Sequence, residues 1–221
     1  MANSNTALVA DSTCDIPADL IQQYGIHIVP AYVIWGEEEF RDRIDISPEE
    51  FYTRLESDPV YPKSAHGSVE DFLRAYQHVQ QRGADEIITI TVSSAMSGTF
   101  SAAQQAAELA AIPVHVVDSR GPTMTTGWQV LAAARAREAG GDVDAMLAAA
   151  AAARRTMVQL VLMDTLEYLQ KGGRIGNAQR WLGTMLNIKP LVYIDHETGV
   201  VEGKDRIRTH RKAVEELYRS F

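Results

Sequence analysis

The amino-acid sequence predicts an α/β fold in which a mostly parallel sheet carries helices on both faces and a second, smaller α/β domain follows. Two observations support this prediction. The strand candidates in the first three quarters of the chain are continuous runs rich in Val and Ile, as in strands buried on both faces. Helix candidates with start signals lie between these runs, and such strand–helix alternation is typical of a parallel sheet.

The elements follow from local patterns. The expected strands are, in chain order, Thr6–Asp11, Ile26–Trp35, Glu86–Val92, Pro113–Asp118, Met157–Met163 and Ile188–Asp195. Ser47-Pro48-Glu49-Glu50 combines an N-cap, a proline at the first helical position and a capping-box glutamate. Ser68 begins a helix that runs to about Arg82. Further helices are expected after Ser97, Thr123 and Asp142.

The pattern changes after Asp164, which is expected to cap a short helix that ends at the glycine-rich run Lys171–Gly176. Another helix to about Leu186, a hairpin around His196–Gly199 and a basic stretch from Lys204 to Lys212 follow. We therefore expect an N-terminal α/β domain at 1–160 and, at 161–221, the beginning of a second α/β domain that is shortened or truncated.

Composition excludes several classes of function. With a formal net charge of −8 the chain lacks the basic face that a nucleic-acid partner requires. No signal peptide and no apolar run of membrane-spanning length are recognisable in the sequence. The single cysteine, Cys14, lies between Asp11 and Asp15, which favours a structural thiol over a nucleophile. A lone cysteine also fits a reducing compartment, so we expect a cytoplasmic protein.

Three predicted strands run into clusters of hydroxyl residues. The fullest cluster is Ser93-Ser94-Ala95-Met96-Ser97-Gly98-Thr99, and the others are Asp11-Ser12-Thr13 and Asp118-Ser119. In an open α/β sheet, ligands bind where strands end and helices begin, so these clusters predict a site that holds an anion by hydrogen bonds. The aspartates are unsuited to contact an anion, and we expect them to orient the loops by accepting bonds from backbone N–H groups.

Motifs of the common catalytic and cofactor-binding classes are missing. The histidines are scattered and have no cysteine partners, so neither a metal site nor a cofactor is expected. The sequence contains no phosphate-binding P-loop and no dinucleotide-binding glycine fingerprint. It also lacks the G-x-S-x-G elbow of the serine hydrolases.

The motifs taken together resemble the DegV family of bacterial fatty-acid-binding proteins. The matching segments are Asp11–Pro17, Tyr24–Ile26, Val29-Pro30, Phe40–Asp42, Ser47–Tyr52, Ser93–Thr99, Val117–Arg120, Asp164–Leu169, Gly172–Ile175 and Leu186–Pro190. Their order and spacing match the family along the whole chain. The resemblance also implies further residues beyond Phe221.

The resemblance implies a lipid-binding protein that is not itself an enzyme. Such a protein clasps a long-chain fatty acid in a cleft between its two α/β domains. It acts as the acyl-binding subunit of a fatty acid kinase, in which a separate ATP-binding subunit phosphorylates the bound carboxylate to an acyl phosphate for phospholipid metabolism. The expected partners are therefore the fatty acid and this kinase subunit.

The resemblance also implies site residues. The carboxylate contacts fall on Ser97 and on Ser64, which takes the place of a threonine in a T-S-Q-P-S loop. In that loop Ala65, His66 and Gly67 replace the usual Ser, Gln and Pro. Arg174, and His66 in the altered loop, are candidate contacts to the head group or to the kinase subunit. Candidates to line the acyl tail are Ile28, Ala31, Val33 and Met163.

Two alternatives remain open at this stage. One is a small-molecule hydrolase or phosphotransferase with Ser97 or Ser94 as its nucleophile, against which stands the lack of a recognisable base or metal set. The other is a regulatory module that senses a different hydrophobic acid.

Overall fold

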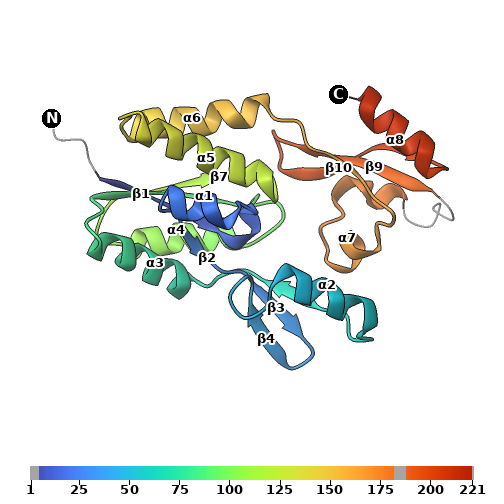
Figure 1. Ribbon diagram of the computed structural model, residues 1–221, viewed down its shortest axis with the longest axis horizontal. Helices are drawn as coiled ribbons and strands as arrows, with labels where there is room; N and C mark the ends of the chain where they lie inside the picture. Colours follow the sequence, from blue (N-terminus) through green and yellow to red (C-terminus); the bar gives the residue numbers. More distant parts are fainter. Residues whose placement is uncertain (1–4, 182–187, 221) are drawn as a thin grey trace.

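The structure is a computed structural model that describes residues 5–181 and 188–220. Its centre is a parallel sheet of β1 (Thr6–Asp11), β2 (His27–Val29), β6 (Glu86–Thr91) and β7 (Val114–Asp118), in the order β2-β1-β6-β7 (Figure 1). The two inner strands, β1 and β6, are almost entirely buried on both faces, which explains why their aliphatic residues do not alternate with charged ones.

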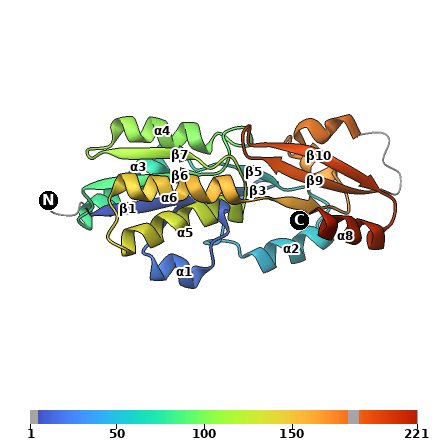
Figure 2. The same ribbon diagram turned by 90° about the horizontal axis from the view of Figure 1, so that it is seen from above.

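Helices cover both faces of this sheet. On one face α3 (Val69–Gln81) and α4 (Thr99–Leu109) pack through Phe72 and Ala103, among others. On the other face lie α1 (Ala18–Gln23), α5 (Met124–Glu138) and α6 (Val143–Thr156). Figure 2 shows α4 on one side of the strands and α5 and α1 on the opposite side. The predicted α/β architecture is confirmed.

A small antiparallel sheet extends from the main one. It consists of β3 (Tyr32–Trp35), β4 (Glu38–Arg41) and β5 (Lys63–Ala65), in the order β4-β3-β5. The buried ring of Trp35 anchors α2 (Pro48–Ser57) through an edge-to-face contact with Phe51, with 5.4 Å between the ring centroids. The guanidinium carbon of Arg54 lies 4.5 Å from the centroid of the Trp35 ring.

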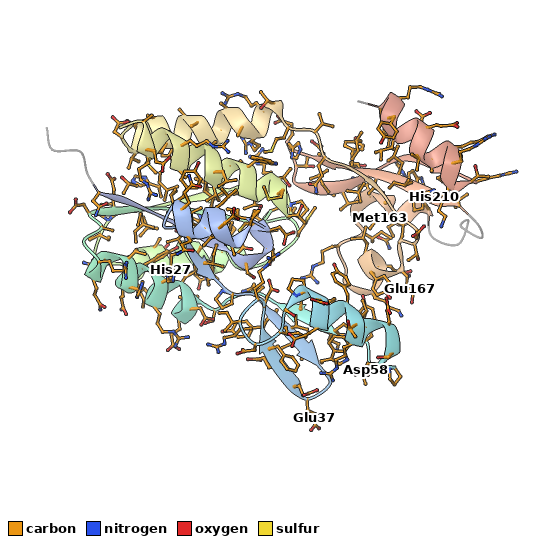
Figure 3. The ribbon with its side chains drawn as sticks, in the orientation of Figure 1. His27, Glu37, Asp58, Met163, Glu167 and His210 are labelled. Carbon is orange, nitrogen blue, oxygen red and sulfur yellow. The ribbon has the colours of Figure 1, made fainter. Side chains whose placement is uncertain are left out.

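The C-terminal unit has its own antiparallel sheet, in the order β10-β9-β8. Its elements are β8 (Leu160–Leu162), α7 (Glu167–Lys171), the 3₁₀ helix η2 (Gly176–Trp181), β9 (Lys189–Asp195), β10 (Val200–Ile207) and α8 (His210–Arg219). Trp181 and Val192 belong to a separate buried cluster between η2 and the sheet, against which Met163 packs (Figure 3). The division into 1–160 and 161–221 stays a prediction; β8 begins at Leu160.

Most local expectations are confirmed, and a few are wrong. The predicted capping box at Ser47 is present, and Ser68, the predicted start of the next helix, caps α3 with a second capping box. The single strand expected over Ile26–Trp35 is two strands in two different sheets, β2 and β3, separated at Pro30, a residue with no N–H to donate.

The expectations for the C-terminal unit need more correction. Asp164 does not cap α7, which begins after Leu166, because its carboxylate binds the Nζ of Lys189 at 2.5 Å. The described part of the next predicted helix is the 3₁₀ helix η2, and its predicted end at Leu186 lies outside the described residues. The hairpin at His196–Gly199 is confirmed by β9 and β10.

The β9–β10 hairpin docks on the main sheet through its turn. The buried Ser93 Oγ donates a hydrogen bond of 2.9 Å to the carbonyl oxygen of Gly199, and the Arg120 guanidinium donates to the carbonyl oxygen of Glu197. Gly199 has a φ of +72°, and an added Cβ would lie 2.1 Å from Ser93 Oγ. The close approach of the two units at this point therefore requires glycine.

We expect Gly199→Ala to lower the free energy of unfolding more than Gly140→Ala does. Gly140 also has a positive φ, of +83°, but its added Cβ would meet nothing within 4 Å, so this variant measures the backbone strain alone. The clash with Ser93 should add about 1–3 kcal/mol, as overpacking does elsewhere. Urea denaturation of both variants checks this, and equal losses would contradict the tight junction.

Candidate functional site

The loop between β6 and α4, Ser93–Gly98, is the candidate functional site, and we call it the serine loop. Two aspartates fix its backbone by accepting hydrogen bonds from N–H groups. The buried Asp11 accepts hydrogen bonds from the backbone N–H of Val92 at 2.8 Å and of Thr13 at 3.0 Å. Burial raises the pKa of the Asp11 carboxyl, and these bonds oppose the rise. Asp118 accepts from the backbone N–H of Ser94 at 3.2 Å.

These bonds confirm that the aspartates at the strand ends orient the loops. Asp118 also accepts from the Ser94 hydroxyl at 2.5 Å and from the backbone N–H of Arg120 at 2.9 Å. Together with the Ser93–Gly199 bond, this assigns the first two serines of the loop to structural bonds. The hydroxyls that remain for a ligand are those of Ser97 and Thr99.

Ser97 and Thr99 lie at the beginning of α4. Their hydroxyl oxygens are 2.8 Å apart, and the backbone N–H of Thr99 donates to Ser97 Oγ at 3.3 Å. Gly98 occupies the N-cap position of the helix and has no side chain to accept from the first N–H groups. The positive end of the helix dipole therefore lies at a hydroxyl pair in which Ser97 is half-buried and Thr99 is buried, an arrangement that suits an anion.

The loop after β5 reaches the same place through His66. An added Cβ on Gly98 would lie 2.6 Å from His66 Nε2 and 2.9 Å from its Cδ2, so the ring rests directly on the Gly98 backbone. Ser64, two residues earlier, is exposed on β5 opposite Val33, and its hydroxyl has no hydrogen-bond partner among the described residues. The structure thus brings His66, in the loop that directly follows the strand of Ser64, against the serine loop.

Arg174 reaches the serine loop from the C-terminal unit. Its Nε donates a hydrogen bond of 3.0 Å to the carbonyl oxygen of Met96, the neighbour of Ser97, and its guanidinium also donates to the carbonyl oxygen of Gly172. Gly173, with a φ of +74°, makes the turn that presents the arginine. Arg174 therefore joins the two units beside the candidate anion site while its side chain stays exposed.

A second contact between the units was not predicted from the sequence. Tyr61 stacks on Tyr168 of α7 with 5.7 Å between ring centroids, and the Nζ of Lys171 lies 4.8 Å from the Tyr61 centroid. Arg120, which binds the β9–β10 turn, was also missed as a junction residue. Nothing in the local sequence marks these side chains, since each meets its partner from a distant part of the chain.

The tail candidates lie in different places. Ile28 packs against the core under α1 and α5, and Met163 packs against the core of the C-terminal unit. Val33 stands opposite Ser64 across the β3–β5 pair. A surface hollow of about 490 Å³ on α2 is lined by Glu49, Glu50, Thr53, Arg54 and Ser57, which are too polar to hold an acyl tail.

Neither candidate nucleophile, Ser97 or Ser94, is hydrogen-bonded to a histidine in the part of the chain that the structure describes, although the Ser94 hydroxyl donates to the carboxylate of Asp118. Residues 5–181 and 188–220 also contain no cluster of three or more His, Cys, Asp or Glu side chains that could hold a metal ion together. Within the same residues, no helix combines the length and the apolar character that a membrane span needs.

Cys14 is a buried thiol, and burial raises its pKa to about 12. At pH 8 only about one thiol in ten thousand is then ionised, whereas an exposed cysteine with its usual pKa near 8.5 is about a quarter ionised. We expect the folded protein to react with a thiol-specific chromogenic disulfide far more slowly than the urea-unfolded protein. Equal rates would show that Cys14 is exposed and reactive.

Comparisons with known proteins identify the family of this chain. A family model described as "uncharacterised protein, DegV family" matches residues 5–221. A DegV domain-containing protein of Streptomyces coelicolor is 36% identical over 214 residues, which cover 96% of this chain and 75% of the relative. The chain belongs to the DegV family.

Solved structures of this family share the fold. A DegV family protein from Thermus thermophilus, described by its fatty acid binding, matches with a TM-score of 0.90 and 36% identity over 98% of this chain and 76% of that one. DegV from Bacillus subtilis, described as a fatty acid binding protein, matches with a TM-score of 0.89 and 29% identity, and the match covers 98% of this chain and 77% of that one.

Proposed function

We propose that this protein binds one long-chain fatty acid and holds its carboxylate at the beginning of α4, with the hydroxyls of Ser97 and Ser64 as hydrogen-bond donors. The observation that carries the proposal is the meeting of the Ser64–His66 segment with the serine loop at Gly98. Fatty acid binding by structurally similar family members supports the choice of ligand.

The chemistry of the head-group site fits a carrier. Each buried methylene contributes roughly 0.8 kcal/mol, so a tail of about fourteen contributes roughly 11 kcal/mol before the costs of binding. Affinity then comes from the tail, and the head-group site need only avoid leaving a buried anion without donors. Neutral hydroxyls meet this need and leave the carboxylate open to a phosphate donor.

The proposal extends to a partner. The bound carboxylate is presented to a separate ATP-binding kinase subunit, which forms an acyl phosphate for phospholipid metabolism, while this chain turns over no substrate itself. This role belongs to a cytoplasmic protein. Arg174 supports the extension, because its exposed side chain lies beside the serine loop, where a partner must approach the carboxylate. The rival hydrolase or phosphotransferase gains little support from Ser97 or Ser94, because the Ser97 hydroxyl pairs with Thr99 and the Ser94 hydroxyl is taken up by the loop-orienting Asp118.

We expect Ser97→Ala to weaken the binding of palmitate by about 1–3 kcal/mol, or roughly 5- to 150-fold, because the carboxylate loses a buried donor. Calorimetric titration of palmitate, kept below its critical micelle concentration, measures the change. Ser101→Ala is the matched control, since that side chain is exposed one turn along α4 and bonds only to Gln105. Unchanged affinity in Ser97→Ala would remove Ser97 from the site.

A further inference from the structure

One nitrogen of the His66 ring, Nδ1, has a hydrogen-bond partner, and the other, Nε2, lies against the serine loop at Gly98. Nδ1 lies 2.9 Å from the carbonyl oxygen of Gly67, and because a carbonyl oxygen only accepts, Nδ1 carries a proton and donates it. The neutral ring therefore has its lone pair on Nε2. That atom lies against Gly98, which stands in the sequence between Ser97 and Thr99.

A lone pair at this position repels a carboxylate, because an ionised carboxylate is also only a hydrogen-bond acceptor. One added proton removes the conflict, as an N–H from Nε2 to the carboxylate or as an O–H from the carboxylic acid to Nε2. We propose that His66 Nε2 shares one proton with the head group of the bound fatty acid, so that binding takes up one proton from solvent. This inference rests on the proposed function and adds a third head-group contact.

The proton balance fixes the expected pH dependence. Above the pH at which the free ring and the free acid have both lost their protons, each binding event consumes one proton, and affinity falls up to tenfold per pH unit. Where the free ring is already protonated, the uptake ends and the affinity levels off. Only a proton is gained, and one proton is taken up per palmitate whether it rests on the nitrogen or on the carboxylate oxygen.

No hydrogen bond or ion pair joins His66 to a charged side chain among the described residues, although charged groups lie on the neighbouring elements. They are Lys63 on β5, Glu70, Asp71 and Arg74 on α3, and Arg174 on the turn after α7. Asp71 is bonded to Ser68 and to Arg74, and Arg174 is bonded to two backbone carbonyls. The helix α4 has no acidic residue in its first turn. Nε2 is thus left to the ligand.

The test compares palmitate binding at pH 6 and pH 8 in the wild type, His66→Gln and His210→Gln. Glutamine keeps an amide donor and cannot titrate. The titration of palmitate itself is the same for all variants and is subtracted. After this correction, His66→Gln should bind palmitate with nearly the same affinity at both pH values. The wild type should bind at least roughly tenfold more tightly at pH 6. His210, exposed at the start of α8, controls for the loss of a histidine elsewhere (Figure 3).

Proton uptake is measured directly by calorimetry at pH 8 in two buffers of different ionisation enthalpy. The wild type and His210→Gln should take up close to one proton per palmitate, and His66→Gln close to none. Equal uptake in the wild type and His66→Gln, with palmitate bound, overturns the role of His66 and leaves the proposed function standing. Absence of palmitate binding to the wild type at both pH values overturns the proposed function as well.

Discussion

The serine loop depends on the hydrogen bond from the Val92 backbone to the carboxylate of Asp11, which is almost fully buried at 3% exposure. This bond ties the end of β6 to the end of β1, and it fixes where the following backbone leaves the sheet. Asp118 repeats the arrangement from β7 by binding the N–H of Ser94. Two carboxylates thereby set the position of the loop that carries Ser97, the proposed head-group contact.

The same loop also joins the two units of the molecule. Ser93 binds the turn of the β9–β10 hairpin, and Arg174 binds the Met96 carbonyl from the other side. A movement between the units would therefore act directly on the backbone that carries Ser97. The site is consequently a property of the assembled molecule, and its geometry should respond to changes at Gly199 or Arg174 that lie outside it.

The sequence alone allowed much of the fold to be predicted, because buried parallel strands and helix caps leave local signals. The apolar runs of β1, β6 and β7 and the cap at Ser47 are read directly from neighbouring residues. Edge elements gave weaker signals: β10 is an edge strand with several exposed charged residues, and α8 buries only Ala213. The sequence therefore suggested only a basic stretch there.

The candidate site was predicted only in part, because only some of its residues carry a local signal in the sequence. The hydroxyl cluster of the serine loop is local and was recognised, as were the aspartates that orient it. The contact of His66 with Gly98 was not, because it joins two loops that only the folded sheet brings together. The stacking of Tyr61 on Tyr168 escaped prediction on the same physical ground.

The most direct test of the central claim, that this protein carries a fatty acid, is native mass spectrometry of the protein as purified from cells. We expect one long-chain fatty acid per chain, released on denaturation and identified by its mass. A protein that carries no acyl ligand, and that gains none when palmitate is added, would contradict it.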